Sequence, residues 1–411
     1  MTLFLFSGAL LNLLIFGGTN ETSVPFPGLS YPVGLVARWG RWFTYGFVIF
    51  LVAVRPRVVL SPLIRNPLIL GVVAVAVLSA AWSTEDLGYQ IRLTSQLVVV
   101  TLFGTYLAGR YRTDELLRFL AILFGLIAAL SVLFILVFPE YGIRADIQEG
   151  PWRGVFRQKN QLGLAALLGG LLFGIIAWRG PGRRRLAALG AVVSIGLLIG
   201  SQSVTSLLVM ASLWVLLPAA VAVRRSRRKA VALLVALCAV WSGLLIVMGQ
   251  REAILFSLGR DVTLTGRTQI WTAVWEQIQE RPVLGYGYRA FWRPLAGPDD
   301  VVGAPTERVL AAVGWETPHS HNGFLDLWVD LGLVGLVFFL GAYLVGLSRA
   351  WRRLLERSDA PGLWHLAFLI TLALRNLTET SFYNNALVWA LMVAAMVVPF
   401  TDGGSETSRA W

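Results

Sequence analysis

Long apolar runs of about 15 to 25 residues recur along the whole chain, and each is long enough, or nearly so, to cross a bilayer as a helix. A backbone in lipid must satisfy its own hydrogen bonds, so runs of this kind fold as helices packed side by side. A hydrophobic fraction of 56% with 14% charged residues agrees with this interpretation. The pattern predicts an all-α integral membrane protein, organised as a single polytopic domain over residues 1–411.

The charges between the apolar runs predict how the chain is oriented. We expect about twelve transmembrane helices, at approximately residues 3–17, 33–54, 67–82, 91–109, 115–138, 160–178, 186–200, 204–223, 231–248, 321–347, 364–380 and 384–400. Arg and Lys gather in tracts at residues 55–65, 110–118, 179–185, 224–229 and 349–357. Basic residues mark cytoplasmic loops, so both termini are expected in the cytoplasm. The net charge of +12 therefore reflects membrane topology and does not indicate nucleic-acid binding.

One outward loop, residues 139–159, breaks this charge rule. It contains Arg153, Arg157 and Lys159 and leads directly through Asn160 into a predicted span. These residues either anchor the protein at the membrane interface or form an anion site that faces outward.

A large outward loop is predicted at residues 249–320, between the ninth and tenth spans. A helix at about residues 266–280 places apolar side chains such as Trp271 and Trp275 on one stripe, so we expect it to lie parallel to the membrane surface. Arg267 falls in its first turn, where a guanidinium and free N–H groups suit a phosphate. The alternative role of Arg267 is contact with lipid headgroups.

Two of the three histidines, His319 and His321, stand where this loop meets the tenth span. Imidazole suits proton transfer near neutral pH, so we interpret His321 as a catalytic base and His319 as a loop residue. Asp326 and Asp330 follow in the span, where a carboxylate is costly unless it is paired or hydrated. They are therefore either functional residues or join helices by pairing with Arg375 or Arg92, and we favour the pairing.

Polar residues also collect at the outward end of the eleventh span. Arg375 and Glu379 stand four positions apart and are expected to pair with each other. The two histidines at positions i and i+2 lack the third and fourth ligands that a zinc site needs, and Cys238 is alone. No metal and no cofactor are expected.

Several motifs, in this order, resemble those of the O-antigen ligase and polysaccharide polymerase superfamily. They are Lys159-Asn160-x-Leu162-Gly163, a Ser-rich span start at Ser201, Gly266-Arg267-x3-Trp271, Pro282-x2-Gly285-x-Gly287, and His321-Asn322 followed by Gly332 and Gly335. The likeness extends over residues 152–385 and is closer to exopolysaccharide polymerases than to lipopolysaccharide ligases.

The resemblance implies an enzyme of the bacterial inner membrane whose active site faces the periplasm. It would transfer a glycan from an undecaprenyl-pyrophosphate carrier to a sugar hydroxyl, either on a growing glycan or on lipid A core, without a metal. His321 would be the base and Arg267 the main cation at the pyrophosphate. The remaining residues expected to bind pyrophosphate or glycan are Arg153, Arg157, Lys159, Asn160, Asn322, Arg375 and Glu379. A transporter or flippase of lipid-linked sugars is the rival class, because it would also have many spans and basic cavities.

Overall fold

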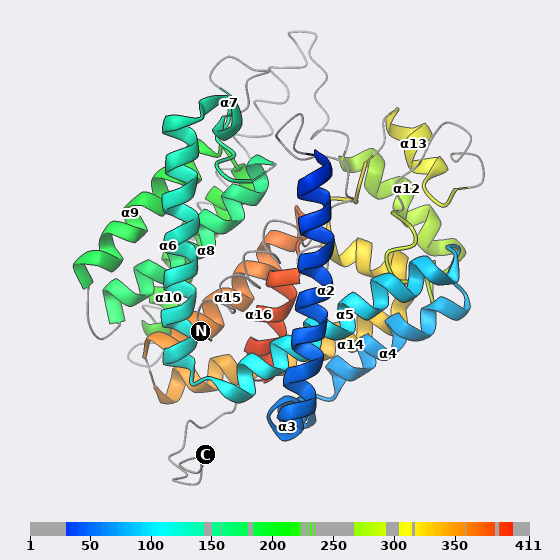
Figure 1. The fold of residues 1–411 in the computed structure, drawn as a ribbon, viewed down its shortest axis with the longest axis horizontal. Coiled ribbons are helices and arrows are strands. Elements are labelled where there is room, and N and C mark those ends of the chain that lie inside the picture. The colour runs from blue at the N-terminus through cyan, green and yellow to red at the C-terminus, as the bar shows by residue number, and fades with distance from the viewer. Residues whose placement is uncertain are drawn as a thin grey trace.

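The chain folds into a bundle of helices joined by loops (Figure 1). The computed structural model describes residues 30–143, 150–156, 158–179, 184–222, 228, 231, 235, 267–292, 304–314, 317–357, 359–382 and 386–397. Across these residues the β structure is limited to an isolated antiparallel bridge between Ile143 and Trp152. The predicted all-α class is confirmed.

The helices differ widely in length. In chain order they are α2 (Ser30–Val54), α3 (Pro56–Arg65), α4 (Leu68–Leu78), the 3-10 turn η1 (Ser79–Ala81), α5 (Leu87–Arg110), α6 (Thr113–Val137), α7 (Pro139–Gly142), α8 (Lys159–Arg179), α9 (Arg184–Gly200), α10 (Val204–Ala222), α12 (Arg267–Glu280), α13 (Glu307–Val313), α14 (Gly323–Glu356), α15 (Ala360–Asn376) and α16 (Ala386–Val397).

Five helices in the described part of the chain are long and apolar enough to cross a membrane: α5, α6, α8, α10 and α14. A sixth span results if α2 and α3 count as one, although they meet at 89°. Pro56 begins α3 and lacks the N–H that would continue α2, which explains the bend. These helices support an α-helical integral membrane protein.

The predicted count of about twelve spans is not supported. The predicted spans 67–82, 186–200, 364–380 and 384–400 correspond to helices with only 11, 17, 17 and 12 residues. A helix of 12 residues rises about 18 Å, too little for a hydrocarbon core of about 30 Å. The predicted span 3–17 and nearly all of 231–248 lie outside the described residues.

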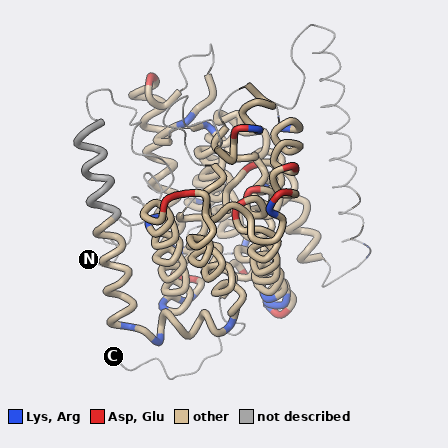
Figure 2. Tube along the Cα trace, turned by 90° about the vertical axis from the view of Figure 1, so that its right-hand side faces the viewer, with Lys and Arg blue, Asp and Glu red and all other residues tan. Residues whose placement is uncertain are grey.

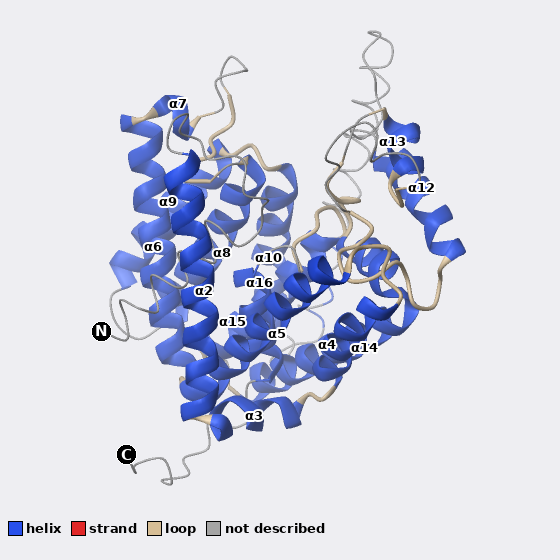
Figure 3. Ribbon diagram, turned by 45° about the vertical axis from the view of Figure 1, so that its right-hand side comes forward, coloured by secondary structure: helices blue, strands red, loops and turns tan. Residues whose placement is uncertain are grey.

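The centre of the bundle is α16, whose twelve residues are all buried. It packs against α5, α14 and α15. Helices α6, α8, α9 and α10 lie on one side of this centre, and α4, α5 and α14 on the other (Figures 1 and 3). Many Lys and Arg residues lie at the end of the bundle where α3 is found, as Figure 2 shows. The opposite end, near α7, α12 and α13, is the end with the predicted outward loops.

Helix α14 is interrupted at Gly332, whose φ of +65° is a left-handed conformation that favours glycine. The segment that follows α12 fills the break: Leu333 N–H donates to Pro282 O at 2.9 Å, and Gly287 N–H donates to Asp330 O at 2.8 Å. A Cβ on Gly332 would lie 2.1 Å from Val283 O. The motif with Gly285 and Gly287 therefore lies on one side of this contact, and Gly332 of α14 lies on the other.

Helix α12 forms where the sequence predicts it, at Arg267–Glu280. Most of its apolar stripe does not face the membrane as predicted. Ile270, Val274 and Ile278 are instead buried against other parts of the protein, including Phe291 and Val329. Apolar surface buried in this way attaches α12 to the bundle. Trp275 remains 43% exposed and is the part of the stripe left for lipid.

Candidate active site

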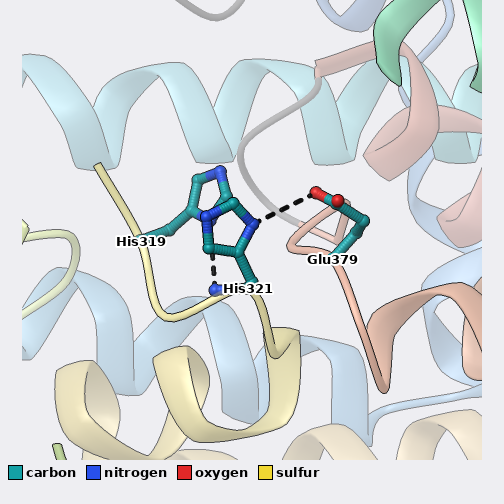
Figure 4. Close-up of side chains that lie close together, drawn as sticks. All are labelled: His319, His321 and Glu379. Atoms are coloured by element: carbon teal, nitrogen blue, oxygen red, sulfur yellow. Dashed lines mark hydrogen bonds and ion pairs between the residues drawn. The ribbon is translucent and has the colours of Figure 1, made fainter. Parts of the chain in front are cut away.

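His319, His321 and Glu379 lie together at the start of α14 (Figure 4). The Nδ1 atom of His321 lies 3.5 Å from Oε2 of Glu379, an ion-pair distance. The rings of His319 and His321 meet edge to face with 4.3 Å between their centres. His321 N–H donates to Nδ1 of His319 at 3.2 Å. A carboxylate that faces Nδ1 of an imidazole leaves Nε2 as the nitrogen that can accept a proton.

The other carboxylate oxygen of Glu379 is held from two sides. Oε1 accepts from Nη2 of Arg267, at 3.3 Å, and from Nδ2 of Asn160, at 3.0 Å. Arg267 comes from the first turn of α12 and Asn160 from the first turn of α8. Glu379 therefore joins a cation and an imidazole that come from distant parts of the chain.

Arg375 supports this arrangement from inside the protein and is only 3% exposed. It donates to Asn160 O at 3.0 Å, to the Ser381 hydroxyl at 3.1 Å and to the Ser206 hydroxyl. A buried guanidinium with this many acceptors is a fixed part of the structure. The approach of α8 to α10 depends on Gly163, because a Cβ there would lie 2.5 Å from Cβ of Ser203.

The predicted pairing of Arg375 with Glu379 is not the contact that the structure shows. Glu379 lies one turn beyond Arg375, to whose carbonyl its N–H donates at 2.9 Å, but among the described residues no ion pair joins the two side chains. Glu379 points to Arg267 and His321 instead, while Arg375 holds the backbone of Asn160.

The predicted helix-to-helix pairing of Asp326 with an arginine is also wrong. Asp326 is fully buried and accepts from Ser320 N–H, at 2.9 Å, and from the Thr380 hydroxyl. It ties the loop before α14 to the segment that carries Glu379. Asp330 accepts from Phe291 N–H at 3.3 Å, which fixes the segment after α12.

His321 adopts a left-handed backbone conformation, with φ of +59°. Such a conformation costs a non-glycine residue about 1–3 kcal/mol and persists where neighbouring contacts impose it. Here Ser320 supplies these contacts: its hydroxyl accepts from Asn322 N–H at 3.1 Å, and its carbonyl accepts from Nε1 of Trp271 at 2.8 Å. The strain directs the ring of His321 toward Glu379.

The two histidines differ in their electrostatic environment. Burial and the neighbouring charges of His321 and Arg267 lower the pKa of His319 to about 4, although Glu379 opposes this shift. An imidazole with so low a pKa is a weak proton acceptor near neutral pH. This low pKa argues against His319 as the base.

Among the described residues, the buried Nε of Arg267 has no hydrogen-bond partner, and the buried Nδ1 of His321 has only its 3.5 Å ion-pair contact with Glu379. Buried polar atoms are normally paired, so the unpaired Nε beside Glu379 indicates a place where a ligand completes the contacts.

The structure does not bring every predicted residue into this cluster. Arg153 donates to Tyr141 O and Glu140 O, at 2.7 and 3.0 Å, so it fastens α7. The side chain of Asn322 caps α14 by accepting from Phe324 N–H at 3.0 Å. Lys159 begins α8 directly before Asn160. Arg157 lies outside the described residues.

The structure corrects one premise of the metal prediction. His319, His321 and Glu379 each offer a ligand atom, and these atoms lie within 4.8 Å of one another. The histidines therefore have a third potential ligand beside them. The sequence could not show this, because Glu379 lies 58 positions after His321 (379 − 321).

Sequence reasoning placed Asn376 in the polar patch at the outward end of the eleventh span without a role, and it missed Ser206 and Thr380. Asn376 is fully buried, and its side-chain oxygen accepts from Ser381 N–H at 2.8 Å and Phe382 N–H at 3.2 Å. Ser206 and Thr380 hold Arg375 and Asp326. The only signal in the sequence was their position at the ends of apolar runs.

Comparison with known proteins confirms the family resemblance. Residues 189–340 match the O-antigen ligase family. The exopolysaccharide production protein ExoQ of Rhizobium meliloti (strain 1021) is 32% identical over 249 residues, which are 57% of this chain and 54% of that protein. The chain thus spans about half the length of that relative. The family match includes Arg267, His319 and His321 and ends before Arg375 and Glu379.

Proposed function

We propose that this chain, which resembles the O-antigen ligase family over residues 189–340, is a membrane glycosyltransferase that uses a lipid-linked glycan as donor. The observation that carries the proposal is the double contact of Glu379 with Arg267 and His321. A fixed cation thus lies beside an oriented imidazole, which are the two groups that the proposed transfer needs. A transporter has no evident need for a base held in this way.

In the proposed reaction, an acceptor sugar hydroxyl attacks the anomeric carbon of the donor glycan. The new C–O bond forms as the bond to the undecaprenyl-pyrophosphate oxygen breaks, and the hydroxyl proton passes to Nε2 of His321. Glu379 favours the tautomer with a proton on Nδ1 and stabilises the imidazolium that results. The resemblance implies inversion at the anomeric carbon.

The leaving pyrophosphate gains negative charge as this bond breaks. Arg267 is 21% exposed in its side chain, so it remains accessible to a ligand while Glu379 holds it. A guanidinium can bind two phosphate oxygens at once, and its fixed position stabilises charge that develops in the transition state. Lys159, at the start of α8, is the second cation we assign to the pyrophosphate.

We assign the cluster to the periplasmic face of the bacterial inner membrane. The positive-inside rule supports this orientation, since the basic tracts of the sequence alternate with short loops that lack Arg and Lys, such as those around residues 85 and 201. Helix α12 would lie at the outer membrane surface, with Trp275 exposed beside it.

Polymerisation of an exopolysaccharide is the favoured reaction, with a growing glycan as acceptor. The name of the relative, an exopolysaccharide production protein, supports this choice. Transfer to lipid A core is the second candidate, supported by the name of the matched family.

The test is transfer by the purified protein in detergent, with a lipid-linked oligosaccharide as donor and excess EDTA present. Because guanidinium groups rather than a metal ion supply the positive charge, we expect transfer to continue in the presence of EDTA. The products would be a lengthened glycan and the free carrier lipid pyrophosphate. If EDTA abolished transfer and magnesium restored it, the assignment of charge stabilisation to Arg267 would be wrong. Lipid A core added in a parallel reaction distinguishes the two acceptors.

A further inference from the structure

The three side chains in Figure 4 have the composition of a zinc site: two imidazoles and one carboxylate. Ligand atoms around tetrahedral zinc lie about 3.3 Å apart, given zinc–ligand distances of about 2.0–2.1 Å. Nδ1 of His321 and Oε2 of Glu379 are 3.5 Å apart, close to this separation. All three ligand atoms lie within 4.8 Å of one another, so small side-chain rotations would bring the set together.

The carboxylate is already oriented for a metal ion. Asn160 and Arg267 both hold Oε1 of Glu379, which leaves Oε2 directed at His321. Hydrogen bonds of this kind to a ligand group commonly fix its orientation in metal sites. Nδ1 of His321 is buried and contacts Oε2 of Glu379 at 3.5 Å, so a metal ion between these two atoms would replace that contact.

We propose that His319, His321 and Glu379 bind a zinc ion, and that bound zinc inhibits the enzyme; the inhibitory part rests on the function proposed above. A neutral imidazole carries one proton. Zinc on Nδ1 of His321 therefore leaves that proton on Nε2, which can no longer accept a proton from the acceptor hydroxyl. The fourth zinc position remains for water.

Nearby charges set the expected strength of binding. Arg267 and Arg375 are positive and oppose a divalent cation, whereas Glu379 is the negative group at the centre of the cluster. His319 would also lose the hydrogen bond from His321 N–H if it binds through Nδ1. We expect a dissociation constant on the order of 1 µM, weaker than that of structural zinc sites.

The experiment is titration of the full chain in detergent with zinc chloride, monitored by calorimetry, after removal of metal with EDTA and of EDTA by gel filtration. We expect one zinc ion per chain. His319→Ala and Glu379→Gln should each weaken binding at least tenfold, because each removes one of three ligands. Glu280→Gln is the matched control. This carboxylate lies on α12, the helix that also carries Arg267, but it is paired with Arg308. His319→Gln serves as a second variant if His319→Ala fails to fold.

Absence of zinc binding would overturn the proposal, as would equal affinities in wild type and both His319 variants. Transfer assays separate this result from failure of the proposed function. If zinc binds and transfer occurs in EDTA, added zinc should reduce transfer at least tenfold and EDTA should restore it. An enzyme that is active and indifferent to zinc contradicts only the zinc site, while a chain that binds zinc but never transfers glycan contradicts only the enzymatic proposal.

Discussion

Replacement of Glu379 by Gln should nearly abolish transfer while it leaves the fold intact. In the wild type, Nδ1–H of His321 faces Oε2 across 3.5 Å. In Glu379→Gln, the side-chain oxygen can still accept from Asn160 and Arg267, so the amide NH₂ takes the place of Oε2. This NH₂ donates to Nδ1 of His321, and the proton of the imidazole moves to Nε2. The nitrogen that faces the acceptor hydroxyl then has no free lone pair.

The size of the effect follows from this change of tautomer. A carboxylate-to-amide change behind a catalytic histidine costs up to about 10⁴-fold in rate when the hydrogen bond is short. The His321–Glu379 contact is longer, so we expect a loss of about 10²- to 10³-fold in kcat, which corresponds to about 2.7–4 kcal/mol. Loss of the negative charge beside Arg267 should cost about 1–2 kcal/mol of stability, less than for a fully buried pair because Arg267 is 21% exposed.

The assay is glycan transfer by purified protein as a function of donor concentration, together with thermal unfolding in detergent. Because Arg267 remains in place, the KM for the donor should change far less than kcat. Glu280→Gln, which removes a carboxylate that is 45% exposed and paired with Arg308, should leave both parameters near the wild-type values. A folded Glu379→Gln protein with unchanged kcat would refute the orienting role of Glu379.

Three further predictions concern the cation, the break in α14 and the orientation. Arg267→Ala should lower transfer about 10²-fold and cost about 1–2 kcal/mol of stability, because it breaks the pair with Glu379. Arg267→Lys should recover only part of the activity, since a point charge cannot replace a bidentate guanidinium; full activity in the alanine variant would contradict this. Gly332→Ala should destabilise the protein by about 3 kcal/mol or more, because its Cβ would meet Val283 O at 2.1 Å, whereas Gly196→Ala, with nothing within 4 Å, should leave the unfolding temperature nearly unchanged. Reporter fusions should give a cytoplasmic signal at Arg353 and a periplasmic signal within residues 304–314, and the reverse would contradict the orientation.

The fold class could be predicted from sequence because long apolar runs fold as packed helices, whether lipid or protein surrounds them. The number of spans could not. A run such as 384–400 is equally apolar whether it crosses a bilayer or, like α16, is buried among other helices. Hydropathy measures how apolar a run of residues is, and it does not show whether lipid or other helices surround that run.

The members of the site could be predicted more reliably than their contacts. His321, Arg267 and Glu379 were expected as functional residues, and the structure brings them together. The partner of Glu379 was predicted wrongly because the one-turn spacing from Arg375 is present in the backbone, but the two side chains turn to other partners. Contacts between α8, α12 and the segment after α15 depend on tertiary packing, which no local pattern encodes.

Glycan transfer by His321→Ala tests the central claim most directly. The measurement compares transfer with binding of the lipid-linked donor, both on purified protein in detergent, across a pH series. We expect donor binding within a few-fold of wild type, since the cations are unchanged, and transfer reduced by about 10²-fold or more, as loss of a general base can cause. The wild-type rate should fall toward acid pH as the base becomes protonated, and this acid limb should be absent from the residual activity of the variant. Near-normal transfer by a folded His321→Ala protein would contradict the account and move the base elsewhere.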